Sequence, residues 1–353
     1  MKNTLSRYIS IILLALIPAC EAEQYEWISS SFSCGVLSTQ VSTYSPAEMT
    51  LKTRFFVLDK EESDQLTKRD VKHNVHFSSI EVSAVMTDFQ EITLPSAGKY
   101  SCAVLLDDVY NTINFDYFEE FSSTEIFLRK YFKNIGINNY ARLAILGNQS
   151  PPVKFHGKYF SNNAGVMDLL LAELLGDPDE PSSEFSQIPV LQGIDMVLDT
   201  INRSAPAGNR NLLLVYSRSS YLKTGITGAS VIAKAKNYGI KVSTIMDFGG
   251  EYHIDYDLNN EDIFYKLAYE TGGFVYKNND ALSGEDMYVL SSRLGNILEG
   301  NFKCFEATWK ITPAGSWTDT FQPGYYATGE IVVDLQTGYD QETFEMPLGI
   351  IIK

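Results

Sequence analysis

The sequence predicts an α/β protein with a doubly wound, mostly parallel sheet, plus a β-sandwich-like domain built from the segments that flank it. Two observations carry this prediction. The central stretch alternates short apolar runs with helical periods, which is typical of strands buried on both faces. The flanks instead show the pattern of antiparallel strands, without a competing helical period. A chain of 353 residues is long enough to bury both cores.

The central stretch supplies four apolar runs and the helices between them. A helical face over 188–201 and a helix over "ASVIAKAKNYG", closed by Gly239, separate some of the runs. Sheets of this class bind ligands at the carboxyl ends of their strands. The four runs are "SCAVLLD", "YARLAIL", "RNLLLVYS" and "KVSTIMDFG".

The flanks contribute strands such as "MTLKTRFFVLD" before the central stretch and "TGEIVVDLQ" after it. Because the later flank has too few strands for an independent sandwich, we expect the two flanks to pack together, with the α/β region inserted between them. Two separate small β-units are the alternative. The predicted segments are a signal peptide (1–19), an N-terminal β-rich segment (20–98), the α/β domain (99–300) and a C-terminal β-rich segment (301–353).

The first twenty residues predict an export signal. "MKNTLSRYISIILLALIPAC" has basic residues, then an apolar core too short to span a bilayer, then small residues before a cysteine. "IPAC" resembles the lipobox of bacterial lipoproteins, which implies that Cys20 is lipidated and anchors the chain to a membrane. An ordinary signal peptide is the alternative. Both place the protein outside the cytoplasm, and Glu21 favours an outer-membrane or surface location.

The remaining cysteines, Cys34, Cys102 and Cys304, would meet an oxidising environment. Without a CxxC or Cys/His cluster, the sequence gives no support for a zinc site. Cys102 lies in "CAVLL" and is expected to pack as a small buried hydrophobe. Cys34 and Cys304 are then the candidate disulfide pair, with an all-reduced protein as the alternative. His73 and His76 in "HNVH" have no third ligand nearby and are expected as surface or hydrogen-bonded groups.

Residues 100–299 resemble a von Willebrand factor type A domain. The resemblance rests on "ASVIAKAKNYGIKVSTIMDFG", on "IFYKLAYETGGFVYKNND" and on the amphipathic helix that follows, with "LAYETGGFVY" as its most specific part. In that family a D-x-S-x-S sequence after the first strand, a threonine and a later aspartate hold Mg²⁺ or Mn²⁺. Hydroxyl and carboxylate oxygens are the ligands such hard ions prefer.

The residues at these positions indicate a degenerate metal-ion-dependent adhesion site. One of two carboxylates remains, and Arg218 would place a positive charge beside any cation. Reading Asp108, Tyr110 and Thr112 instead does not restore the pattern. We therefore expect neither tight metal binding nor a cofactor. The degenerate positions are Asp107, Val109, Asn111, Ile188 and Ser217.

The same stretch, "DDVYNT", predicts a binding face. Aromatic side chains beside polar groups are typical of protein interfaces. Alternatively, the following Phe115 and Tyr117 begin a helix and pack into the domain. The predicted face consists of Asp107, Asp108, Tyr110, Asn111 and Thr112.

Charge and motifs narrow the function further. A net charge of −16 argues against a nucleic-acid partner, and no GxSxG, P-loop, GxGxxG or HExxH motif indicates catalysis. We expect a lipid-anchored, non-catalytic protein of the bacterial cell envelope whose type A-like domain binds proteins without a metal, in adhesion or complex assembly. The alternatives are a metal-dependent adhesin with an unconventional Mg or Mn site at Asp107, Asp108 and Asn111, and a structural subunit of a surface fibre or envelope complex.

Overall fold

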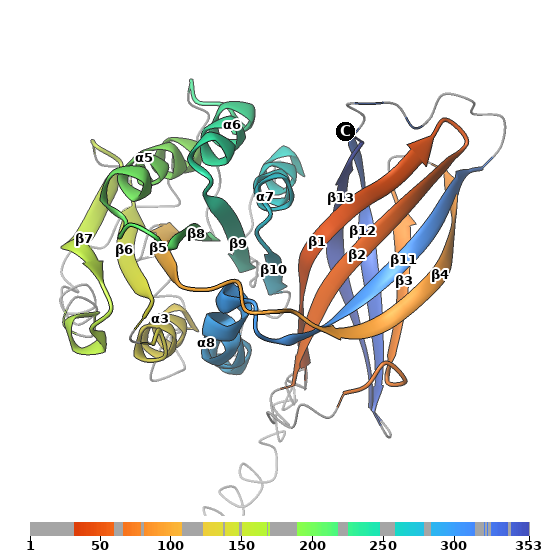
Figure 1. Ribbon diagram of the computed structural model, residues 1–353, viewed down its shortest axis with the longest axis horizontal. Coiled ribbons are helices and arrows are strands. Elements are labelled where there is room, and N and C mark those ends of the chain that lie inside the picture. Colours follow the sequence, from red (N-terminus) through yellow and green to blue (C-terminus); the bar gives the residue numbers. More distant parts are fainter. Residues whose placement is uncertain are drawn as a thin grey trace, which may run out of the picture. The chain divides into compact units, whose positions relative to one another are not determined.

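A ten-stranded sheet and a three-stranded sheet organise the protein (Figure 1). Ser31–Lys353 form one compact unit. The signal peptide and Cys20 lie outside the part of the chain that the structure describes. The computed structural model describes residues 32–59, 66–78, 81–107, 123–136, 138–147, 150–167, 169, 189–217, 225–247, 258–278, 284–314, 321, 323, 326–337 and 340–352.

The central stretch contains six strands and five helices among its described residues. None of these helices has the length and apolar composition needed to cross a membrane. The elements are β5 (Tyr100–Asp107), α3 (Ser123–Lys133), β6 (Tyr140–Leu146), β7 (Val153–Ser161), α5 (Val190–Ser204), β8 (Arg210–Ser217), α6 (Gly228–Tyr238), β9 (Lys241–Asp247), α7 (Leu258–Thr271), β10 (Val275–Asn278) and α8 (Gly284–Glu299).

The strands of this stretch form the mostly parallel sheet that the sequence predicts. Their spatial order is β10-β9-β8-β5-β6-β7, and only β7 runs antiparallel to its neighbour. If these six strands are numbered 1 to 6 in the order in which they occur in the chain, their spatial order from β7 to β10 is 3-2-1-4-5-6. This is the strand order of doubly wound sheets. The order reverses between β5 and β8, and this switch point is where such sheets bind ligands.

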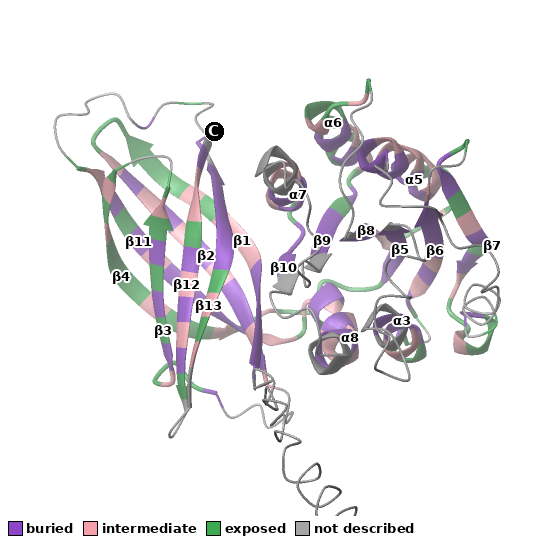
Figure 2. Ribbon diagram, turned by 180° about the vertical axis from the view of Figure 1, so that it is seen from behind, coloured by how far each residue is buried: buried purple, intermediate pink, exposed green. Residues whose placement is uncertain are grey.

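Alternate residues of the central strands belong to two apolar cores, and Figure 2 shows helices on both faces of the sheet, α3 and α8 on one face and α5, α6 and α7 on the other. Along β5, Cys102 and Val104 belong to the core that includes side chains of α3 and α8. Ala103 and Leu105 belong to the core that includes side chains of α5, α6 and α7. Strands covered on both faces explain the apolar runs without polar alternation in the sequence.

The "TGG" of the type A-like phrase closes α7 and fits it against β9. Thr271 Oγ1 accepts the Val242 N–H at 2.9 Å. Gly272 adopts φ +78°, and the Gly273 N–H donates to the Ala268 carbonyl at 2.9 Å, as in a Schellman C-cap. A Cβ at Gly273 would lie 1.9 Å from the Val242 carbonyl oxygen. Thr271 and Gly272 therefore end the helix, and Gly273 allows it to approach β9 closely.

The flanking segments supply the other strands. Among the described residues, β11 pairs with β2 and with β4 in the large sheet, while β12 lies between β3 and β13 in the small one. Side chains from both sheets form a third apolar core. The strands are β1 (Phe32–Ser45), β2 (Glu48–Asp59), β3 (Val71–Phe77), β4 (Val82–Thr93), β11 (Lys303–Pro313), β12 (Tyr326–Thr337) and β13 (Asp340–Ile351).

The flanks and the α/β region share one sheet, a continuity that the sequence does not indicate. β1 pairs antiparallel with β10 through Gly35 opposite Tyr276 and Val36 opposite Val275. This pairing occupies a strand edge that would otherwise leave backbone groups of β10 unpaired. The hydroxyl of Tyr269 on α7 also donates to a backbone carbonyl of β13.

The predicted disulfide between Cys34 and Cys304 is wrong, because both are free thiols in the structure. Their strands, β1 and β11, are separated by β2, which puts them about 10 Å apart, whereas bridged Cα atoms lie within about 7 Å. The two side chains also point into different cores. Cys102 is buried as predicted, and burial raises the pKa of its thiol to about 12 and that of Cys304 to about 11.

A buried polar network crosses the third core and joins the two sheets. His73 on β3 lies 3.1 Å from the Val332 carbonyl through Nδ1, so this nitrogen carries the proton. Its unprotonated Nε2 accepts from the Thr53 hydroxyl at 3.0 Å, and Thr53 Oγ1 in turn accepts from Trp309 Nε1 at 3.1 Å. The ring of His73 packs against the rings of Phe55 and Trp309. Burial lowers the pKa of His73 to about 4, although its bond to Val332 opposes this.

Candidate functional site

The candidate site is the carboxyl edge of the parallel sheet at its switch point. Asp107 is the last residue of β5 and Ser217 the last of β8. Since Leu106 is in register with Tyr216, Asp107 and Ser217 occupy the next positions on neighbouring strands, which lie about 4.8 Å apart. The two described positions of the predicted degenerate site are thus brought together.

Two further polar residues end neighbouring strands at the same edge. β9 ends at Asp247 and β10 at Asn278, and these two positions are in register. The sequence analysis missed both as site residues. The available signal was that each is the last residue of a strand-like run, but their placement at the same edge as Ser217 depends on the strand order, which the sequence does not state.

The other predicted positions lie outside the described residues. This applies to most of the binding face and to three positions of the degenerate metal site, so the structure does not place them. Ile188 directly precedes Pro189, the residue before α5. The undescribed positions are Asp108, Val109, Tyr110, Asn111, Thr112 and Ile188.

Close packing supports the strand ends at this edge. The ring of Tyr216, one residue before Ser217, packs against Phe127 on α3 with ring centroids 5.5 Å apart, and Phe127 stacks on Tyr131. On the opposite face, a Cβ at Gly193 would lie 2.5 Å from Leu146 Cδ1, so α5 approaches the end of β6 closely. The site therefore stands on buried, tightly packed elements on both sides of the sheet.

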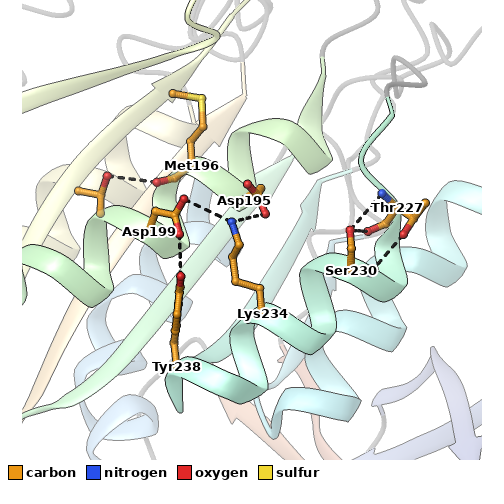
Figure 3. Close-up of polar contacts among 8 residues, drawn as sticks. Asp195, Met196, Asp199, Thr227, Ser230, Lys234 and Tyr238 are labelled. Carbon is orange, nitrogen blue, oxygen red and sulfur yellow. Dashed lines mark hydrogen bonds and ion pairs between the residues drawn. The ribbon is translucent and has the colours of Figure 1, made fainter.

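A polar cluster fixes α5 against α6 (Figure 3). Lys234 Nζ lies 2.6 Å from Asp195 Oδ1 and 3.3 Å from Asp199 Oδ2, and the Tyr238 hydroxyl donates to Asp199 Oδ1 at 3.0 Å. Burial disfavours the charged form of Lys234, but its bonds to the two carboxylates outweigh this and raise its pKa. These groups satisfy one another, so the cluster holds the helices together and is not a ligand site.

The described ends of the strands contribute four polar residues to the sheet edge. Within the described ranges, no group of three or more His, Cys, Asp or Glu residues is placed to hold a metal ion. Mg²⁺ requires near-octahedral coordination by oxygens, usually including one or two carboxylates. By residue type, the last positions of β5, β8, β9 and β10 are Asp107, Ser217, Asp247 and Asn278. These groups suit hydrogen bonding to a polypeptide or another polar ligand.

Comparison with known proteins assigns no family. No protein-family model matches the chain, and no curated protein matches it. Among solved structures, the SpRpn10 VWA domain is 12% identical with a TM-score of 0.41, covering 56% of this chain and 96% of that domain. An aerotolerance-related membrane protein from Bacteroides fragilis, carrying multiple mutations to serines, is 13% identical with a TM-score of 0.38, covering 57% of this chain and 98% of that one.

A longer likeness is to the pilus adhesin SpaC from Lactobacillus rhamnosus GG. It is 8% identical with a TM-score of 0.40, covering 90% of this chain and 48% of the adhesin. This chain thus spans about half the length of that protein. Identities and TM-scores at this level carry no argument about family or function. The α/β assignment rests on the strand order and register described above.

Proposed function

We propose that this chain is a non-catalytic lipoprotein of the bacterial cell envelope that binds a protein partner through the carboxyl edge of its type A-like domain. The observation that carries the proposal is the meeting of Asp107 and Ser217 on adjacent strands at the switch point. That position is where doubly wound sheets bind ligands. Binding of this kind would serve adhesion or the assembly of an envelope complex.

Recognition without a metal is part of the proposal. It is supported by residue identity, because Ser217 stands where the resembled family has an aspartate and Val109 where it has a serine. The first replacement removes a carboxylate, and the second removes a hydroxyl, that a hard cation would bind. Direct hydrogen bonds and surface shape would then replace a metal-bridged contact.

The proposed anchor is a lipid on Cys20, and the proposed location is the outer membrane or the cell surface. Support comes from "IPAC" and the short apolar core before it. The flanking strands, which share a core between two sheets, would form a β-sandwich-like module between the anchor and the binding edge. Labelled palmitate should be incorporated into the full chain and not into a Cys20→Ser variant.

Calorimetric titration of Mg²⁺ and Mn²⁺ into metal-stripped residues 21–353 tests the metal-independent edge. We expect no saturable heat up to millimolar ion. A single site lost in Asp107→Ala and kept in Asp88→Ala would establish instead a metal-dependent adhesin. Asp88 is a matched control because it is an exposed aspartate on β4.

Partner binding is tested with the same fragment. Envelope extract passed over immobilised residues 21–353 should yield a bound protein whose retention is unchanged by EDTA. Less of this protein should be retained by the Ser217→Arg variant, in which a bulky cation occupies the switch point. Lys154→Glu on β7 is the control and should retain as much as the parent. Equal retention by all variants would move the binding surface away from this edge.

A further inference from the structure

We propose that β4 accepts an extended segment of another protein as an added strand, and that this segment carries both apolar and basic side chains. This surface belongs to the flanking strands and is separate from the switch-point edge of the proposed function. Addition of a strand to a free sheet edge is an established mode of peptide recognition, in which backbone hydrogen bonds supply affinity and side chains supply specificity.

The position and exposure of β4 support an open edge. β4 is the terminal strand of the ten-stranded sheet, and within the described residues it pairs with β11 alone. None of its twelve residues is buried, as Figure 2 shows along its length. Val85 is 56% exposed and Met86 38% exposed, which is unusual for large apolar side chains on a strand.

The opposite edge of the same sheet, β7, is protected against pairing with another strand, and β4 is less protected. β7 carries exposed Lys154 and Lys158 and has a positive-φ glycine, Gly157, near a register shift. Lysines and bulges are the devices that keep edges from pairing with other strands. β4, "VSAVMTDFQEIT", contains no Lys, Arg, Pro or Gly. It has one register shift, around Thr87, which leaves Val82–Met86 and Asp88–Thr93 as regular strand on either side.

The apolar core behind β4 also ends at this edge. Ala84 and Phe89 on β4 and Phe77 on β3 pack against the third core but are only partly buried. Met86, in register with the buried Trp309, lies on the same face of β4. Apolar side chains of an added strand would cover this rim, so strand addition would bury surface as well as pair backbone groups.

Charge favours a foreign, basic segment over a second copy of this chain. Glu81 and Asp88 are exposed beside or within β4, and Glu91 lies 3.1 Å from Lys303. Two β4 strands placed side by side would bring their carboxylates together, which is unfavourable between paired strands. A segment with lysine or arginine opposite Asp88 would gain a cross-strand attraction.

The test uses residues 21–353 and a labelled decapeptide of alternating lysine and valine, measured by fluorescence anisotropy. We expect saturable binding that weakens at least about tenfold when alternate peptide nitrogens are methylated, because methylation blocks strand pairing and keeps the charge. Binding should weaken similarly in Val85→Lys/Met86→Lys. It should persist in Tyr159→Lys/Val166→Lys, which adds the same charge at exposed residues of β7 and the segment after it.

Hydrogen exchange localises the bound peptide. Amides of β4 should exchange more slowly in its presence, and those of β7 should not change. The proposal is overturned if the methylated peptide binds equally well, if Val85→Lys/Met86→Lys binds as the parent does, or if no binding occurs at millimolar peptide. It is also overturned if sedimentation shows a dimer that Val85→Lys/Met86→Lys dissociates, since the edge would then bind a second copy. Circular dichroism and melting of each variant establish that it is folded.

Discussion

Acidification should weaken the fold through His73, because the folded protein holds this side chain neutral. Its pKa is about 4 in the structure and 6.5 in its ordinary state. Above pH 6.5 the side chain is neutral in both the folded and the unfolded chain, and its full contribution is present. As the pH falls from 6.5 towards 4, His73 becomes protonated in the unfolded chain but stays neutral in the folded protein. Stability is lost over that window, by about 3 kcal/mol in total.

Urea denaturation between pH 7.5 and 4.5 measures this loss. At pH 7, His73→Gln should be less stable than the parent by about 1–3 kcal/mol, because Thr53 and Val332 lose their buried partner. Between pH 7 and pH 4.5 this stability difference should shift by about 2.5 kcal/mol in favour of the variant, so that it closes or reverses, because the variant has no imidazole to protonate. His76→Gln is the control, since His76 is exposed on the same strand. A gap between the parent and His73→Gln that stays constant with pH would refute this reasoning.

Three further predictions concern packing, charge and thiols. Gly273→Ala should destabilise the fold by more than about 3 kcal/mol in a denaturant titration, because the added Cβ would overlap a backbone carbonyl. Gly295→Ala on α8 should be neutral or stabilising in the same assay. If the two variants lost the same free energy of unfolding, the close approach at Gly273 would be contradicted. Lys234→Met should lower the free energy of unfolding by about 1 kcal/mol in the same assay, and Lys310→Met by less than about 0.5 kcal/mol, since the Lys310 ion pair is more exposed. A larger loss for Lys310→Met than for Lys234→Met would contradict the stabilising role of the cluster between α5 and α6. The three buried thiols should react with a thiol reagent only in denaturant, and rapid reaction under native conditions would contradict their burial.

The sequence predicted the α/β part because its signals are local. Apolar runs without alternation marked β5, β6, β8 and β9, and the helix expected over 188–201 appears as α5. Gly239 closes α6 in the left-handed conformation, as expected. Such features depend on residues a few positions apart, so a single sequence displays them.

The features that the sequence did not indicate depend on which strands become neighbours. The β1–β10 pairing joins residues about 240 positions apart in the chain through two register pairs, and no local pattern encodes it. The disulfide prediction failed for the same reason, because the side of the sheet to which Cys34 and Cys304 point follows from pairing register. At the candidate site, Asp107 and Ser217 were predicted from a motif, whereas Asp247 and Asn278 became visible only once strand order was known.

The register between β4 and β11 bears on how such a chain could have arisen. These strands pair from Val82 opposite Pro313 to Thr93 opposite Lys303, and the pairing continues as the Leu94 N–H donates to the Phe302 carbonyl at 2.9 Å. The chain therefore leaves the flanking strands and returns to them at adjacent points, where a short turn would otherwise close a hairpin. If coding sequence were inserted once at that turn, the whole α/β region would be added and each flanking strand would keep its position. The same two points are where that region could be exchanged for another with closely spaced ends.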